Sequence, residues 1–123
     1  MLKRPTLQHL RILNDPPHGT ERSYDALRLA IALPKHDSKA QVTAFLMADA
    51  VSCAKFGQKT REGFDNLERM LVRLMSAGGR VLLCGTCMDA RGLTAEEVMP
   101  GAVRSTMDEL AQTTIAADKV LMF

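Results

Sequence analysis

The sequence is poor in aromatic residues, with no tryptophan, one tyrosine and four phenylalanines among 123 residues. Proteins that bind single-stranded nucleic acid stack bases on aromatic side chains, so this scarcity argues against that function. The net charge is only +2, and the basic residues are scattered along the chain. Neither nucleic acid nor an anionic membrane surface is therefore expected as a partner. The core is predicted to be aliphatic and filled by methionine, of which there are eight.

Long hydrophobic runs are also missing. No stretch approaches the length of a membrane span, and residues 1–5 are not followed by the apolar segment of a signal peptide. The chain has three cysteines, an odd number. Together these features predict a cytoplasmic protein with reduced thiols, in which the cysteines are free, metal-bound or reactive rather than joined in structural disulfides.

The length fits one domain covering residues 1–123. Short apolar runs alternate with helical patterns, which is the order typical of βαβ units in a parallel sheet. This predicts an α/β fold with three layers, α/β/α, around a mostly parallel sheet. The expected strands are 7–13, 42–47, 81–84, a brief one near 102–103, and a buried C-terminal strand at 120–123.

The helices are predicted from apolar periodicity and capping residues. Thr20 is expected to cap the first helix, which should end at Pro34. A short helix is expected over 49–54. The clearest amphipathic helix is marked by Phe64, Leu67, Met70, Leu71, Leu74 and Met75. The capping-box pairs Thr94 with Glu97 and Ser105 with Asp108 predict two further helix starts.

The segment from Cys84 to Gly92 has the strongest chemical character. Cys84 is the expected last residue of the third strand, and Thr86 with Asp89 has capping-box spacing, so a helical turn should begin near Cys87. Free N–H groups at a helix start favour a thiolate over a thiol. A lowered thiol pKa is what a reactive cysteine needs.

Further residues of the site are expected near these thiols. Gly85 allows the backbone to turn sharply and to approach a ligand, and Arg91 lies one helical turn from Cys87, where it adds positive charge. Ligands of open α/β sheets bind beyond the carboxyl ends of the strands, where three loops could share one pocket. In chain order these loops carry Asn14, Asp15, His18 and Thr20; Asp49 and Ser52; and Cys84 and Cys87.

Alternative interpretations of the cysteines remain open. A structural zinc site needs a second pair of ligands, which neither Cys53 nor the three histidines provide, so no metal or cofactor is expected. A thioredoxin-like redox pair fits a CxxC motif that follows a strand and opens a helix, but thioredoxin-type sequences place it after the first strand. Buried, inert cysteine is common, and Cys53 is expected to be structural.

Several segments together resemble the DsrE/DsrF-like family, especially its small stand-alone YchN-like members. These segments are 14–22, 45–51, 84–92, 105–110 and 117–120, of which Cys-Gly-Thr-Cys-x-x-Ala-Arg-Gly is the most specific. The resemblance implies a five-stranded parallel sheet between helices, in a flavodoxin-like architecture, and assembly into homotrimers or homohexamers. It also implies a persulfide on a cysteine shortly before an Arg-Gly pair, the position that Cys84 occupies before Arg91. Cys87 matches the extra cysteine of the YchN-like members.

Two functions follow from this sequence. One is a sulfur carrier, a possible sulfurtransferase, that receives sulfur on Cys84 from a donor protein and passes it to an acceptor, with Cys87 auxiliary. The other is a non-enzymatic oligomeric binding or thiol redox-sensing module. A nucleotide-binding function lacks a glycine-rich fingerprint. The predicted site residues are Cys84 and Cys87 for catalysis, and Asn14, Asp15, Thr20, Asp49, Gly85, Thr86 and Arg91 for binding.

Overall fold

The structure, a computed structural model, describes residues 7–62 and 65–123. Its centre is a five-stranded sheet with the strand order β4-β3-β2-β1-β5, in which every neighbouring pair is parallel. The strands are β1 (Leu7–Leu13), β2 (Ala40–Leu46), β3 (Arg80–Cys84), β4 (Val103–Ser105) and β5 (Lys119–Met122). The predicted α/β class with a five-stranded parallel sheet is confirmed.

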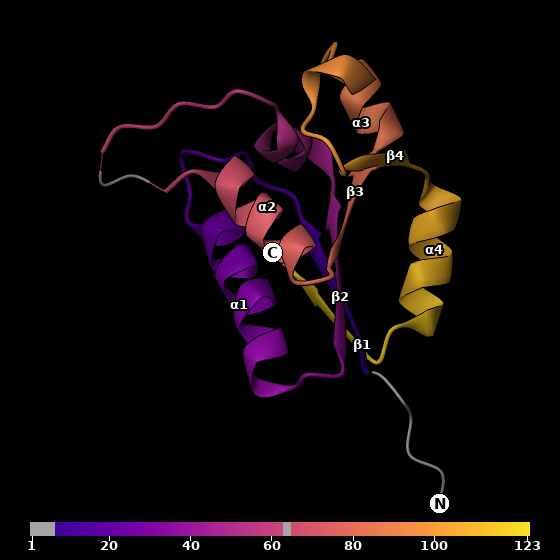
Figure 1. Ribbon diagram of the computed structural model, residues 1–123. Helices are drawn as coiled ribbons and strands as arrows, with labels where there is room; N and C mark the ends of the chain where they lie inside the picture. The colour runs from indigo at the N-terminus through magenta and orange to yellow at the C-terminus, as the bar shows by residue number, and fades with distance from the viewer. Residues whose placement is uncertain (1–6, 63–64) are drawn as a thin grey trace, which may run out of the picture.

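Helices cover the two faces of the sheet (Figure 1). Helices α1 (Arg22–His36) and α2 (Leu67–Ser76) pack side by side on one face, and α4 (Met107–Ala116) crosses the other. The layers are those of a flavodoxin-like architecture, with a strand order of its own. Three short helices, η1 (Ala48–Ala54), α3 (Gly85–Ala90) and η2 (Ala95–Glu97), lie beyond the carboxyl ends of β2 and β3. The cysteine segment is therefore held at the edge of the sheet where ligands of parallel sheets bind.

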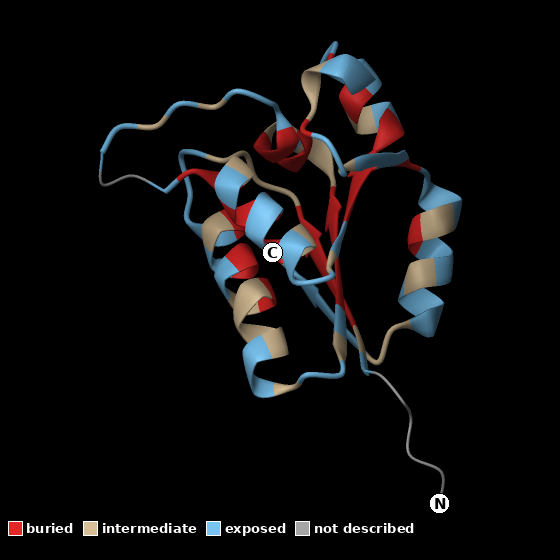
Figure 2. Ribbon diagram, in the orientation of Figure 1, coloured by how far each residue is buried: buried red, intermediate tan, exposed pale blue. Residues whose placement is uncertain are grey.

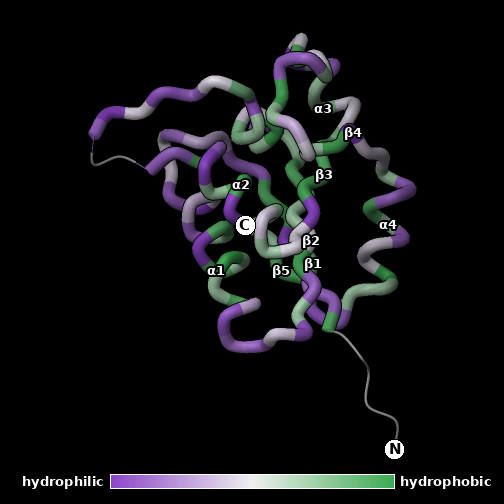
Figure 3. Tube along the Cα trace, in the orientation of Figure 1, coloured by the Kyte–Doolittle hydropathy of each residue, from purple (hydrophilic) through white to green (hydrophobic). Residues whose placement is uncertain are grey.

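The buried core follows the central strands and the inward sides of the helices (Figure 2). Hydropathy follows the same course, with hydrophobic residues along the strands and hydrophilic residues in the loop before α2 (Figure 3). Among the described residues, Phe45 is the only aromatic side chain in the buried core, which also contains Met70, Met88 and Met99. An aliphatic core filled by methionine is therefore what forms. Among the helices of the described residues, none has the length and apolar character that crossing a membrane requires.

The first helix departs from the sequence prediction at both ends. It begins at Arg22, so Thr20 is not its N-cap; the Thr20 hydroxyl instead accepts the N–H of Arg22 at 3.3 Å and donates to the Asp15 carboxylate at 2.8 Å. The helix also continues through Pro34 to His36. A proline removes one helical hydrogen bond but leaves the following N–H groups free to bond, and a single proline in the last turn does not end this helix.

The later helix starts show why capping motifs are ambiguous. Thr94 and Glu97 do form the predicted capping pair before η2. Ser105 was the wrong cap for α4, because it is still part of β4 and its hydroxyl bonds to the Glu109 carboxylate; Thr106 accepts the N–H of Glu109 at 3.1 Å instead. Helix α2 begins at Leu67, after its cap Asn66. Phe64, expected on the same helix, lies outside the described residues.

The C-terminal strand was predicted to be buried, and this prediction was wrong. β5 is an edge strand paired only with β1, and Val120, Leu121 and Met122 are 40%, 44% and 70% exposed. The end of the chain is nonetheless tied down, because the Phe123 N–H donates to the Ile12 carbonyl at 2.8 Å. Truncation at this end would therefore remove sheet hydrogen bonds together with the partly buried Phe123, which packs against the core.

Candidate functional site

Cys84 ends β3 and is itself the N-cap of α3. Its sulfur accepts the backbone N–H of Cys87 at 3.3 Å, and the Thr86 hydroxyl lies 3.4 Å from the same sulfur. The helix begins at Gly85 rather than near Cys87, so the prediction that Thr86 caps it was wrong. Because α3 has only six residues, individual hydrogen bonds rather than a helix dipole act on the sulfur of Cys84.

These hydrogen bonds give the two thiols different acidities. Burial raises the pKa of Cys84, but hydrogen bonds from the Cys87 thiol, the Thr86 hydroxyl and the backbone N–H groups of both residues outweigh it, so that the pKa lies below the ordinary value of 9.0. The pKa of Cys87 is raised by burial and by its bond to Cys84. Of the pair, Cys84 is therefore the residue that ionises first, and Cys87 keeps its proton.

A strained backbone position supports Cys87. The N–H of Ala48, the first residue of η1, donates to the Cys87 sulfur at 3.2 Å. Ala48 has φ of 48°, the only positive φ among the described non-glycine residues. Residues other than glycine seldom adopt this left-handed conformation, and such strain is concentrated at functional sites. It turns the first N–H of η1 towards the cysteine pair.

An ion pair joins the second and third loops of the site. Arg91 donates from Nε and Nη2 to one oxygen of Asp49, at 2.9 Å in each case. Arg91 Nη1 also donates to the Cys87 carbonyl at 3.1 Å. Asp49 and Arg91, which are 42 positions apart, therefore meet beside Cys87.

The predicted residues of the first loop bond elsewhere. The Asn14 side-chain amide donates to the Phe123 carbonyl at 3.0 Å, and Asp15 accepts the Thr20 hydroxyl. These contacts hold the loop and the C-terminus in place. Participation of Asn14, Asp15 and Thr20 in ligand binding stays a prediction, whereas Cys84, Cys87, Gly85, Thr86, Asp49 and Arg91 form one cluster.

Cys53 lies outside the cysteine pair and has other neighbours. It is fully buried in η1, and its sulfur lies 3.7 Å from the Asp15 carbonyl. Burial raises the pKa of Cys53 to about 12. A thiol that stays protonated and inaccessible packs as a small hydrophobic side chain, as expected from the sequence.

Comparison with known proteins places this arrangement in a family. A model of the DsrE/DsrF-like family matches residues 10–123. The chain belongs to this family. It is similar to the YchN protein of Escherichia coli, with 43% identity over 112 residues, covering 91% of this chain and 95% of YchN. An uncharacterized protein of Methanopyrus kandleri is 35% identical over 113 residues, covering 91% and 90% of the two chains.

Solved structures of two proteins support the same fold for this DsrE/DsrF-like chain. The crystal structure of YchN from E. coli matches with a TM-score of 0.90 and 41% identity, covering 96% of this chain and all of that one. A protein of unknown function from Methanobacterium thermoautotrophicum matches with a TM-score of 0.76 at 11% identity, covering 96% and 99%. The second likeness shows the fold alone.

Arg104 is a further residue of the site in this DsrE/DsrF-like chain, and it was not predicted from the sequence. Its guanidinium donates two parallel hydrogen bonds to the Asp89 carboxylate, each 2.8 Å long. The same group lies against Gly85, since a β-carbon added there would be 2.8 Å from Cζ of Arg104. The brief fourth strand was expected at 102–103; its actual position, Val103–Ser105, brings Arg104 to the site.

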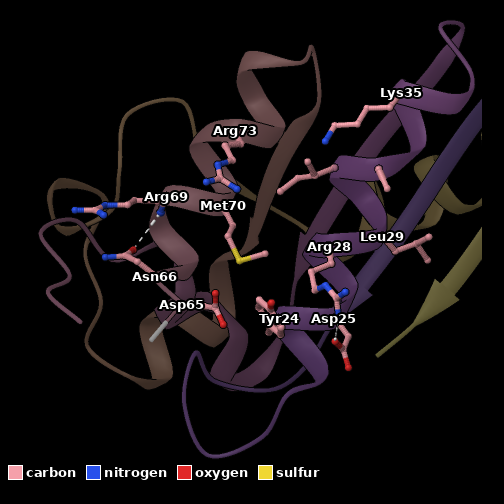
Figure 4. Close-up of a pocket in the computed structure, with 12 residues that line it drawn as sticks. Tyr24, Asp25, Arg28, Leu29, Lys35, Asp65, Asn66, Arg69, Met70 and Arg73 are labelled. Carbon is pink, nitrogen blue, oxygen red and sulfur yellow. Dashed lines mark hydrogen bonds and ion pairs between the residues drawn. The ribbon is translucent and has the colours of Figure 1, made fainter. Parts of the chain in front are cut away.

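Two other features of the DsrE/DsrF-like chain do not coincide with the cysteines. A groove of about 970 Å³ lies between α1 and α2, and Figure 4 shows Arg28, Met70 and Arg73 among the side chains around it. It is lined by none of the three cysteines, and it carries both signs of charge, so it is best described as a solvated groove. Within the described ranges, no three His, Cys, Asp or Glu side chains are grouped to hold a metal ion.

Proposed function

We propose that this chain is a sulfur carrier in which Cys84 takes up a sulfane sulfur as a persulfide and passes it to an acceptor thiol. The observation that carries the proposal is the N–H of Cys87 bonded to the Cys84 sulfur at 3.3 Å, at the carboxyl end of β3. A thiolate is the nucleophilic form of cysteine, and this arrangement favours it at Cys84. Membership of the DsrE/DsrF-like family agrees with a role in sulfur chemistry.

The proposed uptake step is a thiol–persulfide exchange. The Cys84 thiolate attacks the outer sulfur of a donor persulfide, R–S–SH; a bond forms between the Cys84 sulfur and that atom, the donor S–S bond breaks, and R–S⁻ leaves with the electron pair. Cys84 then carries –S–SH. Delivery is the same exchange in reverse, with the thiolate of an acceptor protein attacking the outer sulfur and Cys84 leaving as the thiolate. No net oxidant or reductant is needed.

Cys87 is proposed to act as a hydrogen-bond donor during the exchange. Its pKa is raised, so it remains a thiol while Cys84 ionises, and its proton bonds to the Cys84 sulfur. Cys84 is only 6% exposed, whereas Cys87 is half-buried. A donor therefore reaches the pair from the side of Cys87, which places the auxiliary thiol at the entrance.

The close pairing of the two thiols also favours the second candidate, a thiol redox sensor. Both cysteines are free in this structure, and the N–H of Cys87 is bonded to the Cys84 sulfur. An oxidant would convert them to a disulfide, with loss of two protons and two electrons. This function predicts oxidation without transfer of sulfur to another thiol.

We further propose that the chain works as a homotrimer or homohexamer in the cytoplasm. The three cysteines are free thiols, which suits a reducing compartment. Large apolar side chains are exposed around β5, β4 and α4, and such surface is typical of association sites. These side chains are Val103, Met107, Ile115, Val120, Leu121 and Met122. Light scattering at micromolar concentration tests the assembly.

Intact-mass measurement after incubation with glutathione persulfide tests the proposed function. Wild type and the Cys53→Ser and Cys87→Ser variants should each gain the mass of one sulfur atom, removable by a reducing agent, and Cys84→Ser should not. Transfer to a second thiol distinguishes a carrier from a sensor. Labile sulfur on Cys84→Ser but not on Cys87→Ser would contradict the assignment, and no gain in any variant would contradict the function.

A further inference from the structure

The two cysteines of the pair have separate cationic neighbours. Arg91 bonds to the Cys87 carbonyl at 3.1 Å and, by its charge, favours the ionised form of Cys87. Arg104 comes from a different element, β4, and lies against Gly85, the residue after Cys84. The pKa of Arg104 is raised mainly by Asp89 and to a smaller extent by the charge of Cys84. Arg91 is the one basic residue that the sequence predicts beside the thiols, so Arg104 is an additional charged group.

Strand pairing brings Arg104 to this position. In the parallel register of β3 and β4, Leu83 lies opposite Arg104 and Cys84 lies opposite Ser105. Arg104 is therefore one residue before the partner of Cys84, at the carboxyl end of both strands. Its guanidinium lies against Gly85, the residue that follows Cys84.

Gly85 makes the close approach possible. A β-carbon on this residue would lie 2.8 Å from both Cζ and Nε of Arg104, closer than real β-carbons come to other atoms. The guanidinium thus occupies the space that a side chain at position 85 would fill. A side chain at position 85 would therefore displace the guanidinium, so Gly85 leaves room for Arg104 next in sequence to Cys84.

Asp89 fixes the orientation of the guanidinium. It lies four residues after Gly85, on the same side of α3, and accepts two hydrogen bonds of 2.8 Å from Nη1 and Nη2. A bidentate pair holds a guanidinium in one plane more firmly than a single contact does. Both side chains are half or more exposed. The ion pair itself therefore adds little stability, and its effect is mainly to hold Arg104 over Gly85.

We propose that the positive charge of Arg104 stabilises the anionic sulfur on Cys84, whereas the charge of Arg91 stabilises the anionic form of Cys87. The inference rests on the proposed function only in that the anion is a thiolate or persulfide. A planar, permanently charged guanidinium keeps its charge as the sulfur is loaded and unloaded. Asp89 and Gly85 act through Arg104, the first by holding it and the second by leaving room for it.

The test measures the thiolate of Cys84 without any sulfur donor. In a Cys53→Ser/Cys87→Ser background, the rate of alkylation of Cys84 by iodoacetamide is followed against pH. Arg104→Gln should slow alkylation at neutral pH roughly two- to fivefold, the size expected of one half-exposed charge, and move the pH profile upwards. Gly85→Ala, which displaces the guanidinium, should do the same, and Arg104→Lys should restore part of the rate.

Two arginines serve as controls. Arg80→Gln removes a comparably exposed cation at the opposite end of β3, where it pairs with Glu109, and should leave the Cys84 profile unchanged. Arg91→Gln should shift the profile of Cys87 in a Cys53→Ser/Cys84→Ser background more than it shifts that of Cys84. An Arg104→Gln variant that keeps the wild-type circular dichroism and the wild-type Cys84 profile overturns the inference. Failure of persulfide loading with the Arg104 effect intact counts only against the proposed function.

Discussion

The backbone N–H of Cys87 donates to the sulfur of Cys84 at 3.3 Å, so the two cysteines of one short motif are not equivalent. The pKa of Cys84 is lowered because donors converge on its sulfur, while the pKa of Cys87 is raised by burial and by its neighbour. Cys84 is therefore the thiol that ionises first, whereas Cys87 stays protonated and can donate a hydrogen bond. This asymmetry arises because a strand delivers Cys84 to the first turn of a helix as its cap.

The first prediction distinguishes the effect of the Cys87 thiol on Cys84 from the effect of the Cys87 backbone N–H. Cys87→Ala keeps the N–H but removes the side-chain donor, so the pKa of Cys84 should rise and its alkylation at neutral pH should slow. Cys87→Ser keeps a side-chain donor and should remain closer to wild type. Rates for the two variants in a Cys53→Ser background provide the comparison. Equal rates in both variants would show that only the backbone N–H matters.

Local sequence was sufficient for the elements but not for their contacts. β1 was predicted with its exact bounds, Leu7–Leu13, although His9 and Arg11 interrupt its apolar pattern, because strand length and flanking turn residues were clear. Cys84 was placed correctly at the end of β3, since the apolar run ends there. Capping pairs were less dependable, because neighbouring residues such as Ser105 and Thr106 can both be read as the cap of one helix.

Contacts between distant segments could not be predicted from one sequence. Arg104 was missed because only the register of β4 against β3 brings it to Gly85. The exposure of β5 was missed because an edge strand and a central strand have the same apolar pattern. The strain at Ala48 also depends on tertiary packing, since alanine carries no signal for a positive φ. The location of Cys84 and Cys87 at the end of β3 was therefore predictable from the sequence, whereas the charged groups around them were not.

Ala48 gives a second prediction, about strain. Its φ of 48° is unfavourable for residues with a β-carbon and worst for β-branched ones. Ala48→Gly should leave the free energy of unfolding unchanged within about 1 kcal/mol, because relief of strain offsets the greater freedom of the unfolded chain. Ala48→Val should lower it by about 1–2 kcal/mol or more. Urea denaturation measures both variants.

The same pair of variants reports on the site. In Ala48→Gly the N–H still points at the Cys87 sulfur, so sulfur uptake should be retained. If Ala48→Val proved as stable as wild type, the positive φ would not be a strained feature of this fold.

Arg11 gives a third prediction, about a buried charge. Its side chain, on β1, is 2% exposed, and among the described residues its Nε has no hydrogen-bond partner. Nη1 donates to the Leu10 carbonyl at 3.1 Å and Nη2 lies 3.3 Å from His9 Nδ1, but these are neutral partners. A buried cation that lacks a carboxylate is costly.

Replacement of Arg11 by a hydrophobic residue of similar length should therefore be stabilising. Arg11→Met is expected to raise the free energy of unfolding by about 1 kcal/mol or more, measured by urea denaturation. Arg11→Ala is the matched control, because it removes the charge but leaves a cavity, and it should be less stable than Arg11→Met. A loss of stability in Arg11→Met, with the oligomer also lost, would show that another subunit compensates the charge.

The last prediction concerns pH and His9. His9 is buried on β1, and burial, followed by the charges of Arg11 and Lys119, lowers its pKa below 6.5. Nη2 of Arg11 can only donate, so Nδ1 of His9 accepts and the neutral ring carries its proton on Nε2. The folded protein therefore favours neutral His9. Above pH 6.5 His9 is neutral in both states and adds no pH dependence. Below pH 6.5 the unfolded chain binds a proton on His9 before the folded protein does. The free energy of unfolding therefore decreases as the pH is lowered from 6.5 to the pKa of His9 in the folded protein.

Urea denaturation of wild type and His9→Gln at several pH values on each side of 6.5 measures the effect. Wild type should lose more stability than the variant on the acid side. His36, which is on the exposed end of α1, serves as the control, since His36→Gln should follow the wild-type curve. Parallel curves for wild type and His9→Gln would show that His9 is not the residue that limits stability at acid pH.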